Sequence, residues 1–309
     1  MKNIKIGFSF DALGTKDAPD GKHKFLIRLA RQVHKMGISI DNKKPDVFIR
    51  LVREKICKKA KVNIARVDGL IMNSRWNYKH MNKGIMQSMY ESNGIVYQGK
   101  FCADAYRKFL GIKDVNFKII PNGASPDEFI QRDIRNYFLV SGRWRPHKRL
   151  KQTISSFLLA LKKGLDADLV ITGEPDKKVN HPRIKYTGWQ NSKQLRKLLS
   201  KAIASLHLTW LDWCPNSMIE AIVAGVPIIY SKSGGHNDIG PGSGIGIGDV
   251  QWKWNPIDLY NPPSLDNKQI IDAMFELKKN KPQYPLRKDL MIETVAQQYV
   301  DYGKELLEK

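Results

Sequence analysis

Short apolar runs alternate with amphipathic segments along most of the chain, and this alternation limits the folds that it can adopt. The runs have the length and composition of buried strands, whereas the segments between them repeat apolar residues at helical spacing. This order is typical of an α/β fold with parallel sheets. The predicted strands are 4–10, 46–52, 61–69, 94–98, 117–123, 137–144, 167–173, 183–189, 204–210 and 226–231, and the predicted helices are 24–37, 78–92, 100–111, 148–163, 192–201, a short helix after Pro215 and the tail from Pro285.

A polar, turn-rich segment at 124–136 separates two such series, and the chain of 309 residues is long enough for two cores. We therefore expect a Rossmann-like domain over 1–130 and a second over 131–285, with a C-terminal helix at about 286–309 that packs back on the first. Two α/β domains imply a cleft between them. Ligands of such sheets bind beyond the carboxyl ends of the strands, so the loops there are where chemistry is expected.

The charge of the chain is uneven. The net charge is +22, and residues 1–201 carry 42 Lys and Arg against 17 Asp and Glu, whereas residues 202–309 carry 10 against 13. A lysine-rich composition alone would make the whole chain basic, and the last third does not fit that explanation. A polyanionic partner, either nucleic acid or an anionic membrane face, is therefore favoured.

Three further features concern the setting of the protein. No stretch approaches the roughly 20 apolar residues that span a bilayer, and the N-terminus is expected to be a strand rather than a signal peptide. Cys57, Cys102 and Cys214 have no metal-binding spacing and form an odd set. Free thiols in a reducing cytoplasm are the simplest interpretation.

The segment SGRWRPHKRLKQT, 141–153, follows a predicted strand and opens a helix. Arg143 offers a planar fork to phosphate oxygens and Lys148 adds a compact charge, so a diphosphate is a natural ligand for the two. Gly142 would allow close approach of the backbone. The alternative is a solvated basic helix start, although basic residues are unfavourable near a helix N-terminus.

The segment LDWCPNSMIEAIVAGVPIIY, 211–230, holds Asp212 before a short helix and Glu220 within it. Pro215 and Asn216 suit the start of that helix, with Asn216 as the expected N-cap, and its N–H groups attract anions. Both carboxylates accept hydrogen bonds from hydroxyls. Alternatively Asp212 only caps the helix and Glu220 lies on the surface, but Glu220 falls in an apolar run where an unpaired charge would be costly.

These two segments resemble retaining nucleotide-sugar glycosyltransferases of family 4, which have the GT-B fold. The segment from Gly142 through Arg143 to Lys148 matches the family's diphosphate motif, and Asp212 and Glu220 match its two acids with seven residues between them. The resemblance covers 137–240 well and the first domain loosely. The donor-binding residues that it implies are Gly21, Gly142, Arg143, Lys148, Gly173, Thr187, Gly188, Asp212, Pro215, Asn216, Ser217 and Glu220.

The resemblance implies a metal-independent hexosyl or pentosyl transfer that retains configuration, without a cofactor and with UDP-sugar favoured as the co-substrate. It gives the catalytic set as Asp68, Arg143, Lys148 and Asp212, with Glu220 on the donor ribose. Two departures affect the donor sugar: Asp212 is one methylene shorter than the usual Glu, and Asp20-Gly21 stands where two glycines are usual.

Asp166 and Asp168 precede a strand, at the wrong end of the sheet for a metal site, and we interpret them as a solvated turn.

The acceptor is expected on the first domain, which is rich in basic residues. The candidate acceptor-binding residues are Lys55, Lys58, Lys59, Lys61, Arg75 and Trp76. Basic groups hold phosphates and aromatic faces stack on bases, so a hydroxymethylated base extruded from DNA would fit. A lipid-linked or polysaccharide acceptor at an anionic membrane, and a non-enzymatic polyanion-binding protein with this fold, remain alternatives. DNA is slightly favoured over membrane, and no obligate protein partner is indicated.

Overall fold

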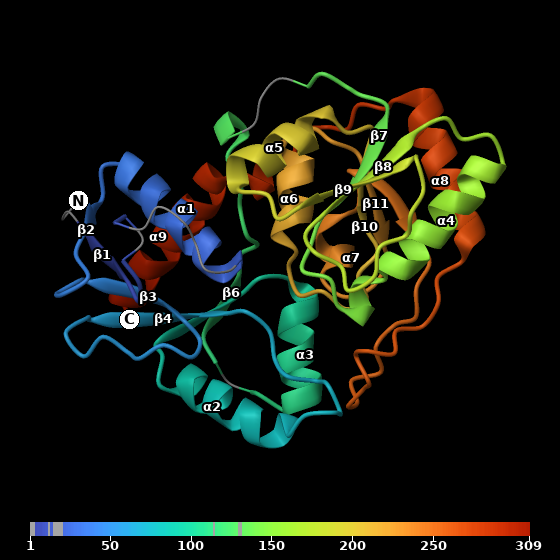
Figure 1. Cartoon of the computed structure of the whole chain (residues 1–309). Helices are drawn as coiled ribbons and strands as arrows, with labels where there is room; N and C mark the ends of the chain where they lie inside the picture. Colours follow the sequence, from blue (N-terminus) through green and yellow to red (C-terminus); the bar gives the residue numbers. More distant parts are fainter. Residues whose placement is uncertain (1–3, 12, 15–20, 114, 129–131) are drawn as a thin grey trace. The chain divides into compact units, whose positions relative to one another are not determined.

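The computed structural model describes residues 4–11, 13–14, 21–113, 115–128 and 132–309. The chain divides into two compact units, drawn in Figure 1. The first comprises Met1–Ala124, Trp254–Ile257 and Lys288–Lys309, and the second comprises Ser125–Lys253 and Asp258–Arg287. The position between 130 and 131, where we expected the domain boundary, and Asp20 lie outside the described residues.

Six parallel strands form the sheet of the first unit within the described residues, in the order β2-β1-β3-β4-β5-β6. Its elements are β1 (Lys5–Phe8), α1 (Gly21–Lys35), β2 (Ser39–Ile40), β3 (Val47–Leu51), β4 (Val62–Val67), α2 (Tyr78–Tyr90), β5 (Gly94–Tyr97), α3 (Lys100–Leu110), β6 (Phe117–Ile119), η3 (Lys288–Leu290) and α9 (Ile292–Leu307).

Helices cover the sheet of the first unit, and its central strands are buried although they include Arg50, Asn63 and Arg66. Every residue of β3 and β4 is buried, as parallel strands between two helical layers require. The buried stripe of α1 includes Phe25, Leu29 and Val33, which share one core with α9 and the strands. Figure 1 shows α1 (blue) beside α9 (red), and α2 and α3 together elsewhere on the sheet.

The second unit repeats this plan with six parallel strands among the described residues, in the order β12-β11-β10-β7-β8-β9. Its elements are η1 (Pro126–Glu128), β7 (Tyr137–Val140), η2 (Pro146–Lys148), α4 (Leu150–Lys162), β8 (Asp168–Thr172), β9 (Ile184–Gly188), α5 (Ser192–Lys201), β10 (Ser205–His207), α6 (Asn216–Val223), β11 (Ile228–Ser231), α7 (His236–Ile239), β12 (Gly244–Ile247) and α8 (Asn267–Asn280).

The strand order of the second unit reverses at β7. The chain moves from β7 to β8 on one side and later returns to β10 on the other side. The loops after β7 and β10 therefore diverge at the carboxyl edge of the sheet, which is where doubly wound folds bind ligands. The predicted α/β fold with two parallel sheets is confirmed.

None of the helices in the described part of the chain is long and apolar enough to cross a membrane. Cys57, Cys102 and Cys214 are free thiols, and the last two are buried.

Candidate functional site

A pocket lies at the strand-order reversal of the second unit. Its lining comes from the end of β7 and the loop after it, from β10 and the loop after it, and from the first residues of α6 and α7. The space between these side chains, including the part that opens to solvent, is about 370 Å³. The polar lining residues are Ser141, Trp144, Lys148, Thr153, His207, Thr209, Asp212, Ser217 and His236.

An ion pair joins the two predicted motifs in this pocket. Lys148 Nζ donates a hydrogen bond to Asp212 Oδ2 at 2.8 Å, and the two side chains are 27% and 19% exposed. Burial opposes ionisation of Asp212, but Lys148 outweighs it and lowers the pKa of Asp212 to about 2. The site therefore presents an ammonium and a carboxylate side by side at neutral pH.

Each member of the ion pair adjoins a residue with left-handed backbone. Arg149 follows Lys148 with φ of 53°, and Leu211 precedes Asp212 with φ of 56°. Among the described residues only four non-glycine positions have positive φ, and these are two of them. Such backbone costs about 1–3 kcal/mol per residue and persists where surrounding contacts enforce it, as often happens at functional sites.

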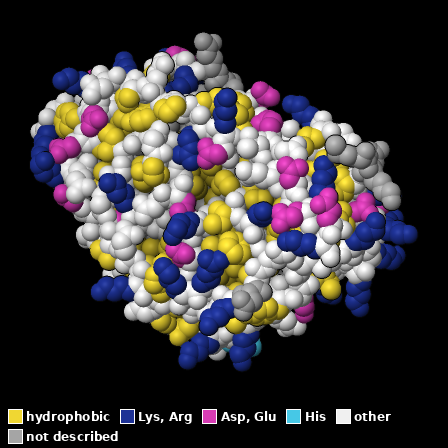
Figure 2. Space-filling view, turned by 180° about the vertical axis from the view of Figure 1, so that it is seen from behind, with side chains coloured by type: hydrophobic (Ala, Val, Ile, Leu, Met, Phe, Trp, Pro, Cys, Tyr) yellow, Lys and Arg dark blue, Asp and Glu magenta, His cyan; other side chains and the backbone are white. Residues whose placement is uncertain are grey.

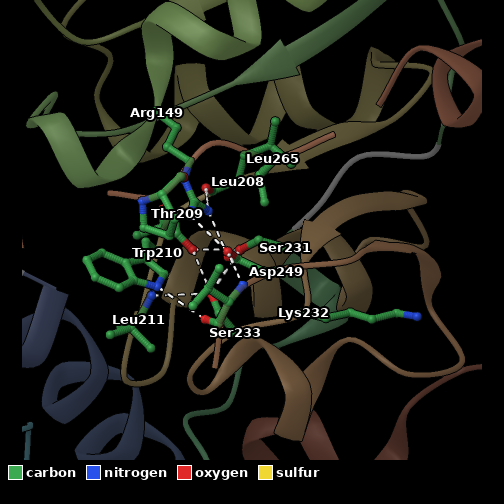
Figure 3. A network of polar contacts seen from close by, with 12 residues as sticks. Arg149, Leu208, Thr209, Trp210, Leu211, Ser231, Lys232, Ser233, Asp249 and Leu265 are labelled. Atoms are coloured by element: carbon green, nitrogen blue, oxygen red, sulfur yellow. Dashed lines mark hydrogen bonds and ion pairs between the residues drawn. The ribbon is translucent and has the colours of Figure 1, made fainter. Parts of the chain in front are cut away.

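Those contacts are hydrogen bonds to the segment between Leu208 and Asp212 (Figure 3). Arg149 Nη1 donates to Leu208 O at 3.1 Å. Ser231 Oγ donates to Thr209 O at 2.6 Å, and Ser233 Oγ accepts from Leu211 N at 3.3 Å. In addition, the Gly235 amide donates to Asp212 O at 2.7 Å, and the Trp210 amide to His147 O at 2.8 Å. The backbone that carries Asp212 is thus fixed from several sides.

Three histidines belong to this region. From the sequence, His147 was a candidate for contact with donor phosphate or for a surface role and His236 for a place at the border of the cleft, whereas His207 was not singled out. His207 is the last residue of β10, His236 begins α7 and His147 lies in η2 beside Lys148. Burial lowers the pKa of His207 to about 3, and that of His147 and His236 to about 4. All three rings are therefore neutral at pH 7. A histidine inside an otherwise apolar strand was the available signal for His207.

Three of the predicted glycines lie side by side. Gly173 donates its amide to Gly188 O at 2.8 Å, and a Cβ on Gly173 would come within 2.2 Å of Gly142 O. Gly173 and Gly188 have φ of 79° and 68°, which favours glycine at both. Thr187 is next to this group, with its hydroxyl 3.5 Å from Ile171 O.

Arg143 and Glu220 do not belong to the lining of the described pocket. Arg143 is exposed, and its guanidinium lies 5.9 Å from the ring centre of Trp189, which is 60% exposed. Glu220 is 2% exposed, so it is not a surface residue. Asp212 and Glu220 both act to raise the pKa of His207, against the larger effect of burial.

The start of α6 differs from expectation. Pro215 is the N-cap and Asn216 the first helical residue, so the expectation that Asn216 caps the helix is wrong. The carbonyl of Pro215 accepts hydrogen bonds from the amides of Met218 and Ile219, and its extended backbone suits this position. Pro215 and Ser217 both line the pocket.

In the first unit, Asp68 follows the carboxyl end of β4. It forms an ion pair with the buried Arg66 and accepts a hydrogen bond from Gln98 Nε2 at 3.2 Å. Arg66 in turn donates to Asn122 Oδ1 at 2.6 Å. The loop after Asp68 carries Arg75 and Trp76, both exposed, at this same edge of the sheet. Gly21, at the start of α1, is exposed.

The four candidate lysines lie in the connection between β3 and β4. Lys61 precedes the first residue of β4 and forms an ion pair with Asp46 at 2.8 Å. Because a strand rises about 3.3 Å per residue, the seven steps from Lys61 to Asp68 span about 23 Å, with one residue just before β4 and the other just after it. The structure therefore does not bring Lys61 together with Asp68, Arg75 and Trp76. Lys55, Lys58 and Lys59 are exposed.

Basic residues occur in both units. The first unit carries 28 Lys and Arg against 15 Asp and Glu, and the second carries 24 against 15. The acidic α9 belongs to the first unit, which reduces the contrast seen along the sequence. On the face drawn in Figure 2, Lys and Arg side chains are distributed over most of the surface, with Asp and Glu between them.

Acidic residues elsewhere are engaged in ion pairs. Asp166 pairs with Arg183 at 2.7 Å, and Asp168, the first residue of β8, pairs with Arg183 and Lys185. In the part of the chain that the structure describes, no three His, Cys, Asp or Glu side chains are grouped as ligands of a metal ion.

Comparisons with known proteins agree with this geometry. Residues 125–240 match the family model "Glycosyl transferases group 1". A search of curated proteins found no significant match. Among solved structures, a sucrose-phosphate synthase from Thermosynechococcus elongatus superposes with a TM-score of 0.69 at 12% identity, over 99% of both chains. HepE from Anabaena in complex with UDP-glucose gives 0.62 at 12% identity, over 99% of this chain and 98% of that one.

A third structure, AviGT4, a glycosyltransferase of avilamycin A biosynthesis, gives a TM-score of 0.61 at 15% identity over 99% and 98%. These superpositions show the fold, and at identities this low they show the fold alone. The chain has the GT-B fold of glycosyltransferases, and its segment 125–240 is similar to the glycosyl transferases of group 1.

Proposed function

We propose that the protein is a nucleotide-sugar glycosyltransferase of family 4 that transfers a sugar from a nucleoside diphosphate to a hydroxyl with retention of configuration. The observation that carries the proposal is the Lys148–Asp212 ion pair, which lines a pocket at the strand-order reversal of the unit that matches group 1 glycosyl transferases. HepE, with the same fold, is described in complex with UDP-glucose, which favours UDP as the nucleotide.

The residues present suit a departing diphosphate. As the bond from the sugar to the diphosphate breaks, negative charge grows on the leaving oxygen, and Lys148 is placed to stabilise it. Arg143, five residues before Lys148 in the sequence, is proposed as a second cation, and its guanidinium lies over the ring of Trp189. Because two side-chain cations are available for this charge, we propose that transfer is metal-independent. Asp212 and the buried Glu220 would bind sugar and ribose hydroxyls.

For the acceptor we propose a polyanion, with hydroxymethylated DNA favoured over an anionic membrane surface. Two observations support this: the first unit is basic, and Arg75 and Trp76 are exposed on the loop that follows Asp68. With three free thiols in the chain, we place the activity in the cytoplasm.

The test combines UDP-, GDP- and ADP-sugars with three acceptors: hydroxymethylated DNA, unmodified DNA, and anionic vesicles that contain a glycolipid. Mass spectrometry of each acceptor identifies the product and the mass added. A sugar added to modified DNA alone supports the full proposal, and a sugar added to glycolipid alone supports the membrane alternative. The proposed activity is wrong if no sugar nucleotide binds or is consumed in any combination.

A further inference from the structure

Two histidines that line the pocket, His207 and His236, each have a buried Nε2 without a hydrogen-bond partner among the described residues, and His236 also has a described contact at its other ring nitrogen. His236 is 0% exposed and lines the pocket beside Lys148 and Asp212. Its Nε2 is buried and has no hydrogen-bond partner among the described residues. Buried polar atoms nearly always have a partner, so an unpaired one on a residue that lines a pocket points to a ligand that supplies it.

The tautomer of this ring follows from its neighbours. His236 Nδ1 lies 3.1 Å from Ser231 Oγ. The single hydroxyl proton of Ser231 is directed to Thr209 O at 2.6 Å. Ser231 Oγ can therefore only accept from the ring, so the proton is on Nδ1 and Nε2 carries a lone pair.

The ring is also uncharged. Burial lowers the pKa of His236 to about 4, and Lys148 acts in the same direction, whereas Asp212 opposes it. At neutral pH Nε2 is thus a hydrogen-bond acceptor and not a donor. It cannot bind a phosphate oxygen, which also accepts.

The chemistry of the pocket around Nε2 matches a polyhydroxylated ring. Asp212 offers acceptor oxygens, and Lys148 and Ser217 offer donors. A sugar hydroxyl both donates and accepts, so it can satisfy Nε2 with its proton while its oxygen accepts from a neighbouring donor. An apolar group at this place would leave Nε2 buried and unpaired.

We propose that His236 is a specificity-determining residue whose Nε2 accepts a hydrogen bond from one hydroxyl of the transferred sugar. The protein then selects sugars by the presence of that hydroxyl and discriminates against the corresponding deoxy sugar. Ser231 is a positioning residue, because it holds the tautomer that leaves Nε2 free to accept. This inference rests on the proposed function.

The first experiment observes the ring directly. The full-length protein is labelled with ¹⁵N-histidine, and the His236 resonances are assigned by comparison with His236→Phe. UDP alone should leave the Nε2 resonance in place, and the sugar nucleotide found in the donor screen should shift it upfield. If the sugar nucleotide binds by calorimetry while Nε2 does not move, the inference is wrong although the proposed function stands.

The second experiment tests whether discrimination against a deoxy donor depends on His236. Transfer is measured with the accepted donor and with its deoxy analogues, one hydroxyl at a time, for wild type, His236→Phe and His207→Phe. One analogue should lower kcat/KM about tenfold or more in wild type and by less than about twofold in His236→Phe. Equal losses for every analogue in wild type and His236→Phe, or coupling that follows His207, would overturn the assignment.

A third variant keeps the test valid if His236→Phe does not fold. Ser231→Ala retains the imidazole but removes the Oγ atom that accepts from Nδ1, so the other tautomer becomes more accessible. We expect the discrimination against the critical deoxy analogue to fall at least threefold, with a ¹⁵N spectrum that shows both tautomers. Unchanged discrimination together with mixed tautomers would contradict the inference. If neither UDP nor any sugar nucleotide binds wild type, the proposed function itself is wrong.

Discussion

Arg149 and Asp249, 100 residues apart in sequence, form a bidentate ion pair that is almost completely buried. The two hydrogen bonds are 2.8 and 2.9 Å long, and the side chains are 2% and 0% exposed. Arg149 also donates to Leu208 O and Pro263 O, each at 3.1 Å. Because the guanidinium makes four described hydrogen bonds, the left-handed backbone of Arg149 is held in place, and Lys148 beside it is oriented.

Asp249→Asn should destabilise the second unit by about 3–5 kcal/mol, because it leaves the buried guanidinium without its counter-charge. Chemical denaturation followed by tryptophan fluorescence would measure this loss. The matched control is Asp272→Asn, which breaks an exposed pair with Lys268, with side chains 57% and 77% exposed. That control should change stability by less than about 0.5 kcal/mol. Equal effects would show that the buried pair does not stabilise the unit.

The sequence predicted the fold class because the information was local. Apolar runs of strand length alternate with helical spacing, and the two sheets follow from that order. The strand β12 was not predicted, because its sequence GIGI contains glycine, which is unfavourable in strands. Nor was α8 predicted, since no motif drew attention to the interval between 241 and 284.

The site was accessible from sequence only in part. Lys148 and Asp212 follow different strands of one parallel sheet, so their convergence could be anticipated from the motif positions. The ion pair of Arg149 with Asp249 and the hydrogen bond of Ser231 with His236 depend on tertiary packing, and no local pattern reports them. By contrast, the separation of Lys61 from Asp68 already follows from the predicted strand 61–69, which has one residue near each end.

Removal of the ammonium at Lys148 should reduce catalysis more than donor binding. We expect Lys148→Met to lower kcat about 10²–10³-fold, because the growing charge of the diphosphate loses its neighbouring cation. Burial of Asp212 is then unopposed by Lys148, so the pKa of Asp212 should rise from its value of about 2. Steady-state kinetics would check the first effect. Lys151→Met, an exposed lysine on α4, is the control and should retain full activity.

Acid should destabilise the second unit through the three neutral histidines of the pocket region, two of them buried and one partly buried. The pKa of His147 and His236 is lowered to about 4 and that of His207 to about 3, against 6.5 in the unfolded chain. The unfolded state therefore binds more protons between these values, and stability falls as pH falls below about 6.5. Each ring contributes a slope of about 1.4 kcal/mol per pH unit there.

Thermal melting between pH 8 and pH 4.5 would measure this dependence. His207→Asn should flatten the slope below pH 6.5 by about one third, whereas His80→Asn, on an exposed site, should leave it unchanged. A melting temperature that stays constant down to pH 5 would contradict the neutral state assigned to the three rings.

Two of the grouped glycines should respond differently to a methyl group. In Gly173→Ala the new Cβ would lie 2.2 Å from Gly142 O at a φ of 79°, so the fold must shift and stability should fall by about 1–3 kcal/mol. In Gly142→Ala the nearest atom is 3.8 Å away, on Trp144, so the melting temperature should not change. Loss of UDP binding in Gly142→Ala without loss of stability would then report close approach of the diphosphate to this backbone.

Charge reversal would test whether the candidate lysines bind a polyanion. Lys55, Lys58, Lys59 and Lys61 are exposed at the β3–β4 connection, and together they would release counterions on binding DNA. Changing all four to Glu should weaken DNA binding at least tenfold and reduce its salt dependence, while UDP-sugar affinity stays constant. Reversal of four exposed lysines in the second unit, Lys151, Lys163, Lys177 and Lys193, is the matched control. Equal losses in both variants would mean that binding follows net charge and that the β3–β4 connection is not a specific acceptor surface.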